Sequence, residues 1–275
     1  MRSSSSSLRR LTAKTVGCLA ITLAAGCGSA DGGQSAQPEQ PVSPGKALAL
    51  AAKQAKQVRS FASTLHVQVS GTSVAALSGT MQYRAKPLLT QLNLTIGASG
   101  QKLAVKEIIT GSAVYMNLPV LTRQIGKPWL KMTFAQLRKN AGINLAQLFQ
   151  QTSSNDPFNQ TRMLTASKNA REVGTQVIGG VPTTEYAGSY PAALGLRQLP
   201  PSLRGHLQPQ IKALGLRTVK FHIWLDAQHH TRRVITDEIG SKGSITSRVD
   251  TTAINQPVTV TLPPSSQVAP LPAGA

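Results

Sequence analysis

The chain has 275 residues, a formal net charge of +19 from 29 Lys and Arg against 10 Asp and Glu, and only 4% aromatic residues. This length suits one domain with a substantial core. The cations are scattered along the chain without interleaved aromatic residues, which argues against a nucleic-acid-binding protein despite the charge.

The first 26 residues have the pattern of a secretion signal. Four cations and no acid precede an apolar stretch over residues 15–25. A membrane-spanning helix needs about 20 apolar residues, so this shorter stretch predicts a cleaved signal peptide over residues 1–26. Its removal takes away four cations and no acid, and leaves a net charge of +15.

The signal ends in Leu-Ala-Ala-Gly-Cys at residues 23–27. Small residues before a cysteine resemble the lipobox of bacterial lipoproteins, whose cysteine accepts a diacylglycerol as a thioether. The lipobox prefers leucine three residues before the cysteine, whereas here that residue is Ala24 and Leu23 lies one position further back. Cys18 lies inside the signal and is lost on cleavage, so no disulfide can form. We expect lipidation at Cys27 and an anchor on the extracytoplasmic face of the cell membrane.

Residues 27–45 carry the lipidated cysteine and a polar stretch rich in Gly, Ser, Gln and Pro, which predicts a disordered tether. We expect the folded domain over residues 46–268 and a disordered tail over residues 269–275. Within the domain, apolar residues at spacings of three and four predict a helix over Lys46–Ser63.

From Leu65 the hydrophobic period changes to two. Alternation between apolar and polar residues predicts strands near 65–69, 77–84, 91–96, 102–107, 113–118 and 126–132. Residues 133–166 predict helical or irregular structure.

Two strands over 170–178 and 182–189 flank Gly179-Gly180, a hairpin signal. A helix over 191–214 follows. The last predicted strands are 219–225, 232–239, 244–253 and 258–262. This order predicts an α+β fold in which helices cover one face of an antiparallel sheet.

Three stretches within residues 46–268 resemble actinobacterial lipoproteins of the LppX/LprG type, which share the LolA-like fold. They are Gly-Lys-Pro-Trp-Leu-Lys at 126–131, the passage from Pro-Pro-Ser-Leu-Arg at 200–204 to the strand ending Trp-Leu-Asp at 224–226, and Pro-Val-Thr-Val-Thr-Leu-Pro-Pro at 257–264. The resemblance implies a curved antiparallel half-barrel sheet with helices on its concave face. It also implies an apolar cavity between sheet and helices that binds a lipid or glycolipid.

Apolar residues on the concave face of the central strands are the candidates to line such a cavity, although each can equally be ordinary core. They are Leu92, Leu94, Ile96, Leu103 and Val105, with Met116 and Met132 as adaptable fillers. Trp224 has the opposite parity to Phe221 and Ile223, so it either packs under a loop or lies at the rim of a cavity.

No nucleophile or phosphate-loop motif occurs, so we expect neither an enzyme nor a cofactor. The adjacent His229 and His230 fall in a predicted loop, and two ligands without a third give a weak metal signal. Asp237 and Glu238 are neighbours in a predicted strand, so their side chains point to opposite faces.

Two functions therefore stay open. The first is a monomeric, membrane-anchored envelope lipoprotein that binds or carries a lipid or other hydrophobic ligand. The second is an envelope protein that carries no ligand and uses its basic surface to bind a protein partner, an anionic polymer or lipid head groups.

Overall fold

The computed structural model of the chain divides into two compact units, residues 1–40 and 41–275. It describes residues 42–71, 75–98, 100–119, 125–136 and 157–270, all in the second unit. The predicted signal peptide, Cys27 and nearly all of the predicted tether lie outside these residues. None of the helices in the described part is long and apolar enough to cross a membrane.

The elements of the first half are a short helix and a strand meander. They are α1 Pro44–Ala55, β1 Ser60–Gly71, β2 Ala75–Arg84, β3 Leu89–Ala98, β4 Gln101–Thr110, β5 Ala113–Asn117 and β6 Trp129–Thr133. The second half adds three more α-helices among the described residues. It comprises α5 Pro157–Leu164, β7 Arg171–Ile178, β8 Val181–Pro191, α6 Ala192–Arg197, α7 Pro201–Leu214, β9 Leu216–Leu225, β10 Thr231–Gly240, β11 Gly243–Ile254, the 3₁₀ turn Ser265–Gln267 and β12 Val268–Pro270.

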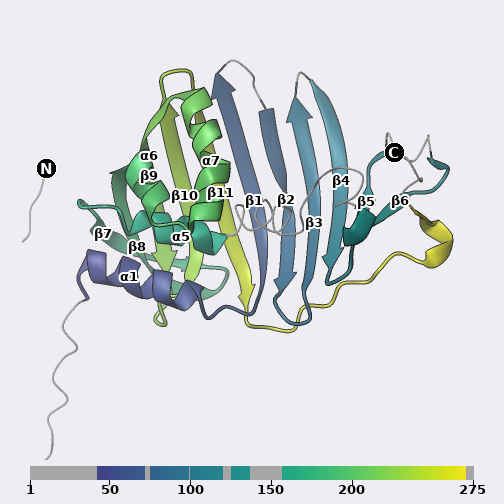
Figure 1. Cartoon of the computed structure of the whole chain (residues 1–275). Coiled ribbons are helices and arrows are strands. Elements are labelled where there is room, and N and C mark those ends of the chain that lie inside the picture. Colours follow the sequence, from purple (N-terminus) through teal and green to yellow (C-terminus); the bar gives the residue numbers. More distant parts are fainter. Residues whose placement is uncertain (1–41, 72–74, 99, 120–124, 137–156, 271–275) are drawn as a thin grey trace, which may run out of the picture. The chain divides into compact units, whose positions relative to one another are not determined.

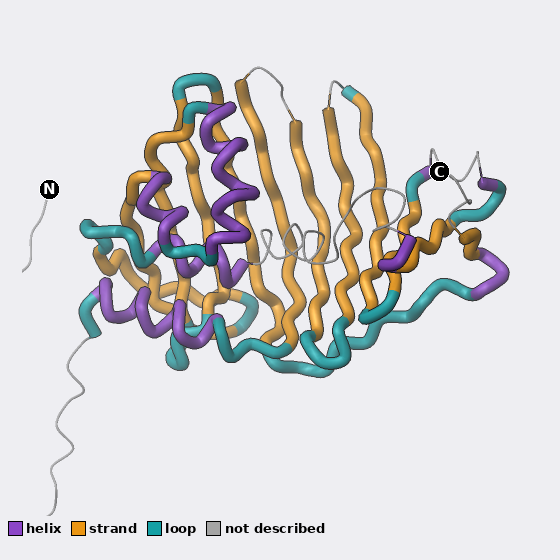
Figure 2. The backbone as a smooth tube through the Cα atoms, in the orientation of Figure 1, coloured by secondary structure: helices purple, strands orange, loops and turns teal. Residues whose placement is uncertain are grey.

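The twelve strands of the described residues form one open sheet in the order β12-β6-β5-β4-β3-β2-β1-β11-β10-β9-β8-β7. Neighbouring strands are antiparallel except for β12, which runs parallel to β6. Helices α5, α6 and α7 lie on one face of this curved sheet, over the strands at the β7–β11 end (Figures 1 and 2). The predicted fold class, an α+β half-barrel with helices on its concave face, is confirmed.

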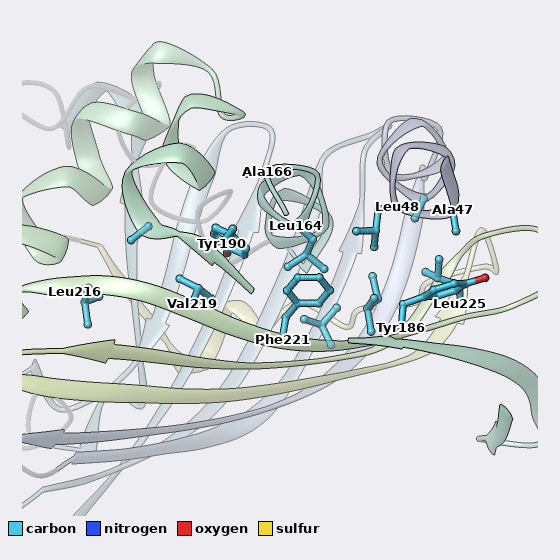
Figure 3. Packing of buried hydrophobic residues seen from close by; sticks show 14 residues of the cluster. Ala47, Leu48, Leu164, Ala166, Tyr186, Tyr190, Leu216, Val219, Phe221 and Leu225 are labelled. Carbon is cyan, nitrogen blue, oxygen red and sulfur yellow. The ribbon is translucent and has the colours of Figure 1, made fainter. Parts of the chain in front are cut away.

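The core lies between these helices and the sheet. Alternate residues of β9 point toward the helices and are buried, among them Val219 and Phe221 (Figure 3). Leu164 of α5 and Leu48 of α1 complete the same cluster from the other side. Burying side chains of this size contributes roughly 1.5–3 kcal/mol each, so the helices are held to this end of the sheet mainly by apolar contact.

The first predicted helix is too long. It ends at Ala55, and residues from Ser60 onward belong to β1. Phe61 is fully buried in the sheet, where it pairs with Tyr83 of β2 and Ile254 of β11. Because sheet pairing and burial of this aromatic side chain outweigh weak helical periodicity, tertiary structure decides the end of the helix.

Two other element predictions need correction. The helix predicted over 191–214 is broken into α6 and α7 around Pro200 and Pro201, because a proline disfavours helical geometry in the residue before it. Residues 258–262 form no strand. Instead Val268–Pro270 pairs with β6 and extends into the stretch predicted as a tail.

The predicted hairpin at Gly179-Gly180 is confirmed between β7 and β8. Both glycines have positive φ angles, 57° and 82°, which residues without a side chain adopt at no steric cost. The meander predicted from Leu65 is also confirmed, as strands β1 to β5.

Candidate functional site

One largely apolar face of the sheet extends from beneath the helices to the opposite half of the sheet. The strand register shows which residues lie on it. Directly opposed residues on neighbouring strands point to the same face. One row of partners begins at the core residue Phe221 and consists of Phe221, Thr236, Ser247, Val67, Leu77, Ile96 and Leu103. The adjacent row begins at Ile223 and consists of Ile223, Val234, Val249, Leu65, Gly79, Leu94 and Val105. We call the face that bears both rows the helix-bearing face.

The far ends of the two rows form a patch of Leu94, Ile96, Leu103 and Val105, which we call the β3–β4 patch. Its residues are half-buried except Leu103, which is 39% exposed. The described helices α5, α6 and α7 pack instead against β8, β9 and β10. Four large aliphatic side chains thus share one face of two neighbouring strands without forming part of the core beneath those helices.

The remaining predicted lining residues lie on the same face. Leu92 packs against the buried cluster of Phe61 and Met81, so it belongs to the core. Met116 of β5 lies opposite Leu130 of β6. Met132 lies opposite Val114, which is fully buried. All seven predicted residues therefore share the helix-bearing face, and four of them gather in the β3–β4 patch.

Two carboxylates on this face were not predicted as site residues. Glu107 lies opposite Leu92 and Met116, and burial raises its pKa. Glu238 lies opposite Val219 and Ile245, and burial raises its pKa to about 7. The sequence signal that could have identified Glu107 was its parity, since it follows Leu103 and Val105 at intervals of two residues.

The other face of the sheet carries polar and charged side chains. Asp250 of β11 pairs with Arg248 at 2.7 Å and also with Arg233 of β10. Burial by itself would raise the pKa of Asp250, but hydrogen bonds from the two guanidinium groups outweigh it and hold the pKa below its usual value.

Trp224 lies among these polar groups, on the face opposite the helices. Its ring stacks on His222 at 6.0 Å between centroids, and the Arg233 guanidinium lies 5.5 Å from its centroid. His222 Nδ1 in turn lies 2.7 Å from a carboxylate oxygen of Glu185. Trp224 is buried, so its role is packing within the sheet surface rather than lining a cavity on the helix-bearing face.

The His229-His230 pair lies in the turn between β9 and β10, organised by the buried Asp226. Asp226 accepts backbone N–H bonds from Gln228 at 3.0 Å and His230 at 2.8 Å, and a side-chain bond from Arg232 at 2.9 Å. Across residues 42–71, 75–98, 100–119, 125–136 and 157–270, no three His, Cys, Asp or Glu side chains group to hold a metal ion.

No protein-family model and no curated protein matches this chain. Among solved structures, it is similar to the lipoprotein LppX of Mycobacterium tuberculosis, with 20% identity, a TM-score of 0.44, and coverage of 78% of this chain and 98% of LppX. It is similar to LprF of Mycobacterium bovis, with 14% identity, a TM-score of 0.47, and coverage of 80% and 99%. A LolA superfamily protein of Nitrosomonas europaea aligns with 8% identity, a TM-score of 0.24, and coverage of 80% and 96%.

Proposed function

We propose that this protein is an envelope lipoprotein, anchored through Cys27, that binds the apolar part of a lipid-like ligand on the β3–β4 patch. The proposal rests mainly on one observation. The two rows that contribute Phe221, Ile223 and Val234 to the core under the helices continue across the sheet, past the hydrogen-bonded Thr236 and Ser247 in one row, to the four apolar residues of the β3–β4 patch. Ligand-binding surfaces are typically apolar with a few polar groups that orient the ligand.

Glu107 supplies such a polar group at the border of the patch. It is on β4, two residues after Val105, and therefore on the same face of the sheet. Burial raises its pKa. The carboxyl group can accept a hydrogen bond from a ligand, and its protonated form can also donate one to a ligand oxygen. An acyl chain would lie along the patch, with an ester or head-group oxygen near Glu107.

The test places a charge on the patch and compares it with the same charge on the other face. Leu94→Asp puts a carboxylate in the centre of the patch. Thr95→Asp puts one on the exposed opposite face of the same strand, where Thr95 pairs with Ala104. Both are made in the full chain carrying Cys27→Ser, so that no acyl anchor contributes to the signal.

We would measure binding of the fluorescent apolar probe N-phenyl-1-naphthylamine, and lipid recovered by organic extraction and mass spectrometry. Leu94→Asp is expected to weaken probe binding at least about tenfold, because ligand contact would strip water from the new carboxylate. Thr95→Asp is expected to bind like the parent. Equal binding by the two variants, or no binding by the parent, would refute the proposed site.

The anchor has its own test. In the natural host, Cys27→Ser is expected to give an uncleaved precursor or a released protein without lipid. A Cys27→Ser chain that remains in the membrane fraction with its signal removed would contradict anchoring through this residue.

A further inference from the structure

A cavity lies away from the β3–β4 patch, where α1, the end of α5 and the α6–α7 connection meet. Its volume is about 460 Å³, within the range of small-molecule sites. Ala49, Ala52, Lys53 and Lys56 line it from the α1 side, and Arg162 comes from α5. Since α1 buries a different set of residues against the core, among them Leu48, this cavity opens on another side of the helix.

The lining of this cavity is cationic. Lys53, Lys56 and Arg162 all border it, and none of its lining residues is acidic. Within the described part of the chain, these three side chains form no ion pair, and Nε of Arg162 is buried without a hydrogen-bond partner. A buried guanidinium N–H without an acceptor is costly, so the cavity lacks the acceptor that its donors require.

The negative partial charges of the neighbouring helix ends offset only part of this positive charge. α1 and α5 both end beside the cavity, with Lys53 and Arg162 in their last turns. A helix C-terminus carries roughly half a negative charge. Two such ends offset about one of the three cations, which leaves an excess of about two positive charges.

We propose that this cavity binds a phosphate group, carried either by an anionic lipid head group or by a small soluble phosphate ester. A phosphate monoester dianion matches the excess charge, and the monoanionic phosphodiester of a lipid head group offsets part of it. The oxygens of either accept charge-assisted bonds from one guanidinium and two ammonium groups. The volume holds a single head group rather than a length of polymer.

The position of the cavity makes a head group reachable. Lys53 and Lys56 are at α1, the first helix of the described residues. Residues 28–41 can span at most about 50 Å when fully extended. This argument about reach rests on the proposed anchor, whereas the charge and volume of the cavity do not.

The test uses the full chain carrying Cys27→Ser and two single substitutions on α1. Lys53→Glu reverses a charge at the cavity, and Lys46→Glu makes the same change at an exposed residue of the same helix that does not line it. One measurement is co-sedimentation with phosphatidylcholine vesicles that contain or lack phosphatidylglycerol. The other is calorimetric titration with glycerol 3-phosphate.

Lys53→Glu is expected to weaken binding to anionic vesicles at least about tenfold, and Lys46→Glu less than about twofold. Glycerol 3-phosphate binding that Lys53→Glu abolishes supports a site for soluble esters as well. Vesicle binding with the same selectivity, but without glycerol 3-phosphate binding, supports the lipid head group as the source. An equal loss of binding in Lys53→Glu and Lys46→Glu overturns the proposal. It is also overturned if the parent binds neither the anionic vesicles nor glycerol 3-phosphate. Neither result affects the test with the apolar probe, so the two proposals can fail separately.

Discussion

Glu238 gives the sharpest test of how this sheet is packed. It lies on the helix-bearing face of β10, between Val219 of β9 and Ile245 of β11. Burial raises its pKa from 4.5 to about 7. Its neighbour Asp237 lies on the opposite face, where Thr246 donates a hydrogen bond to it at 2.9 Å.

The raised pKa fixes the sign of the pH dependence. In the unfolded chain Glu238 has its ordinary pKa, so the folded state binds the proton more tightly. Its contribution to the free energy of unfolding is therefore present at pH 4.5 and is lost as the pH rises to about 7. At about 1.4 kcal/mol per pH unit over about 2.5 pH units, this loss is at most about 3.5 kcal/mol.

Glu238→Gln removes the titrating group at nearly constant volume. We expect the variant to be more stable than the parent at pH 8, and to lose less stability than the parent between pH 5 and pH 8. Part of the dependence should remain, because the pKa of Glu107 is also raised by burial. Asp250 does not interfere, since its lowered pKa places its titration below this pH range.

The assay is urea unfolding followed by circular dichroism at pH 5 and pH 8, with the free energy of unfolding obtained by linear extrapolation. Asp237→Asn is the matched control and should keep the pH dependence of the parent. If Glu238→Gln loses as much stability as the parent and the control between the two pH values, the carboxyl is not buried as described.

Three further substitutions test other parts of the packing by the same urea assay. Leu164→Ala, in the last turn of α5, should cost about 2–5 kcal/mol, because this side chain is fully buried; a smaller cost would mean that α5 is not packed on the sheet. Asp250→Asn should cost about 1–3 kcal/mol by weakening the acceptor for Arg233, and no change would show the pair to be solvated. Gly79→Ala should cost about 1–3 kcal/mol, because the new methyl group would collide with the carbonyl oxygen of Asn93; a neutral result would exclude that close strand approach.

Local patterns in the sequence were sufficient for most strands. A strand with one buried face alternates strictly, so parity was enough to predict that Leu94 shares a face with Ile96, and Leu103 with Val105. The register of β3 against β4 then places both pairs on the same face. The same rule separated Asp237 from Glu238. The helix end at Ala55 was not predictable in this way, because it depends on Phe61 pairing with strands that are distant in the chain.

The sequence by itself determined the apolar and polar faces of the strands, since the alternation depends on residues close together in the chain. Its first 27 residues, by the same kind of local pattern, led to the expectation of a secretion signal ending before Cys27. Only the tertiary structure decided that β1 pairs with β11, which joins the two halves into one sheet and aligns Phe221 with Leu103 in one row. It alone also brought Lys53 and Lys56 beside Arg162, more than a hundred residues away. Such groupings depend on long-range packing, which no short window of sequence encodes.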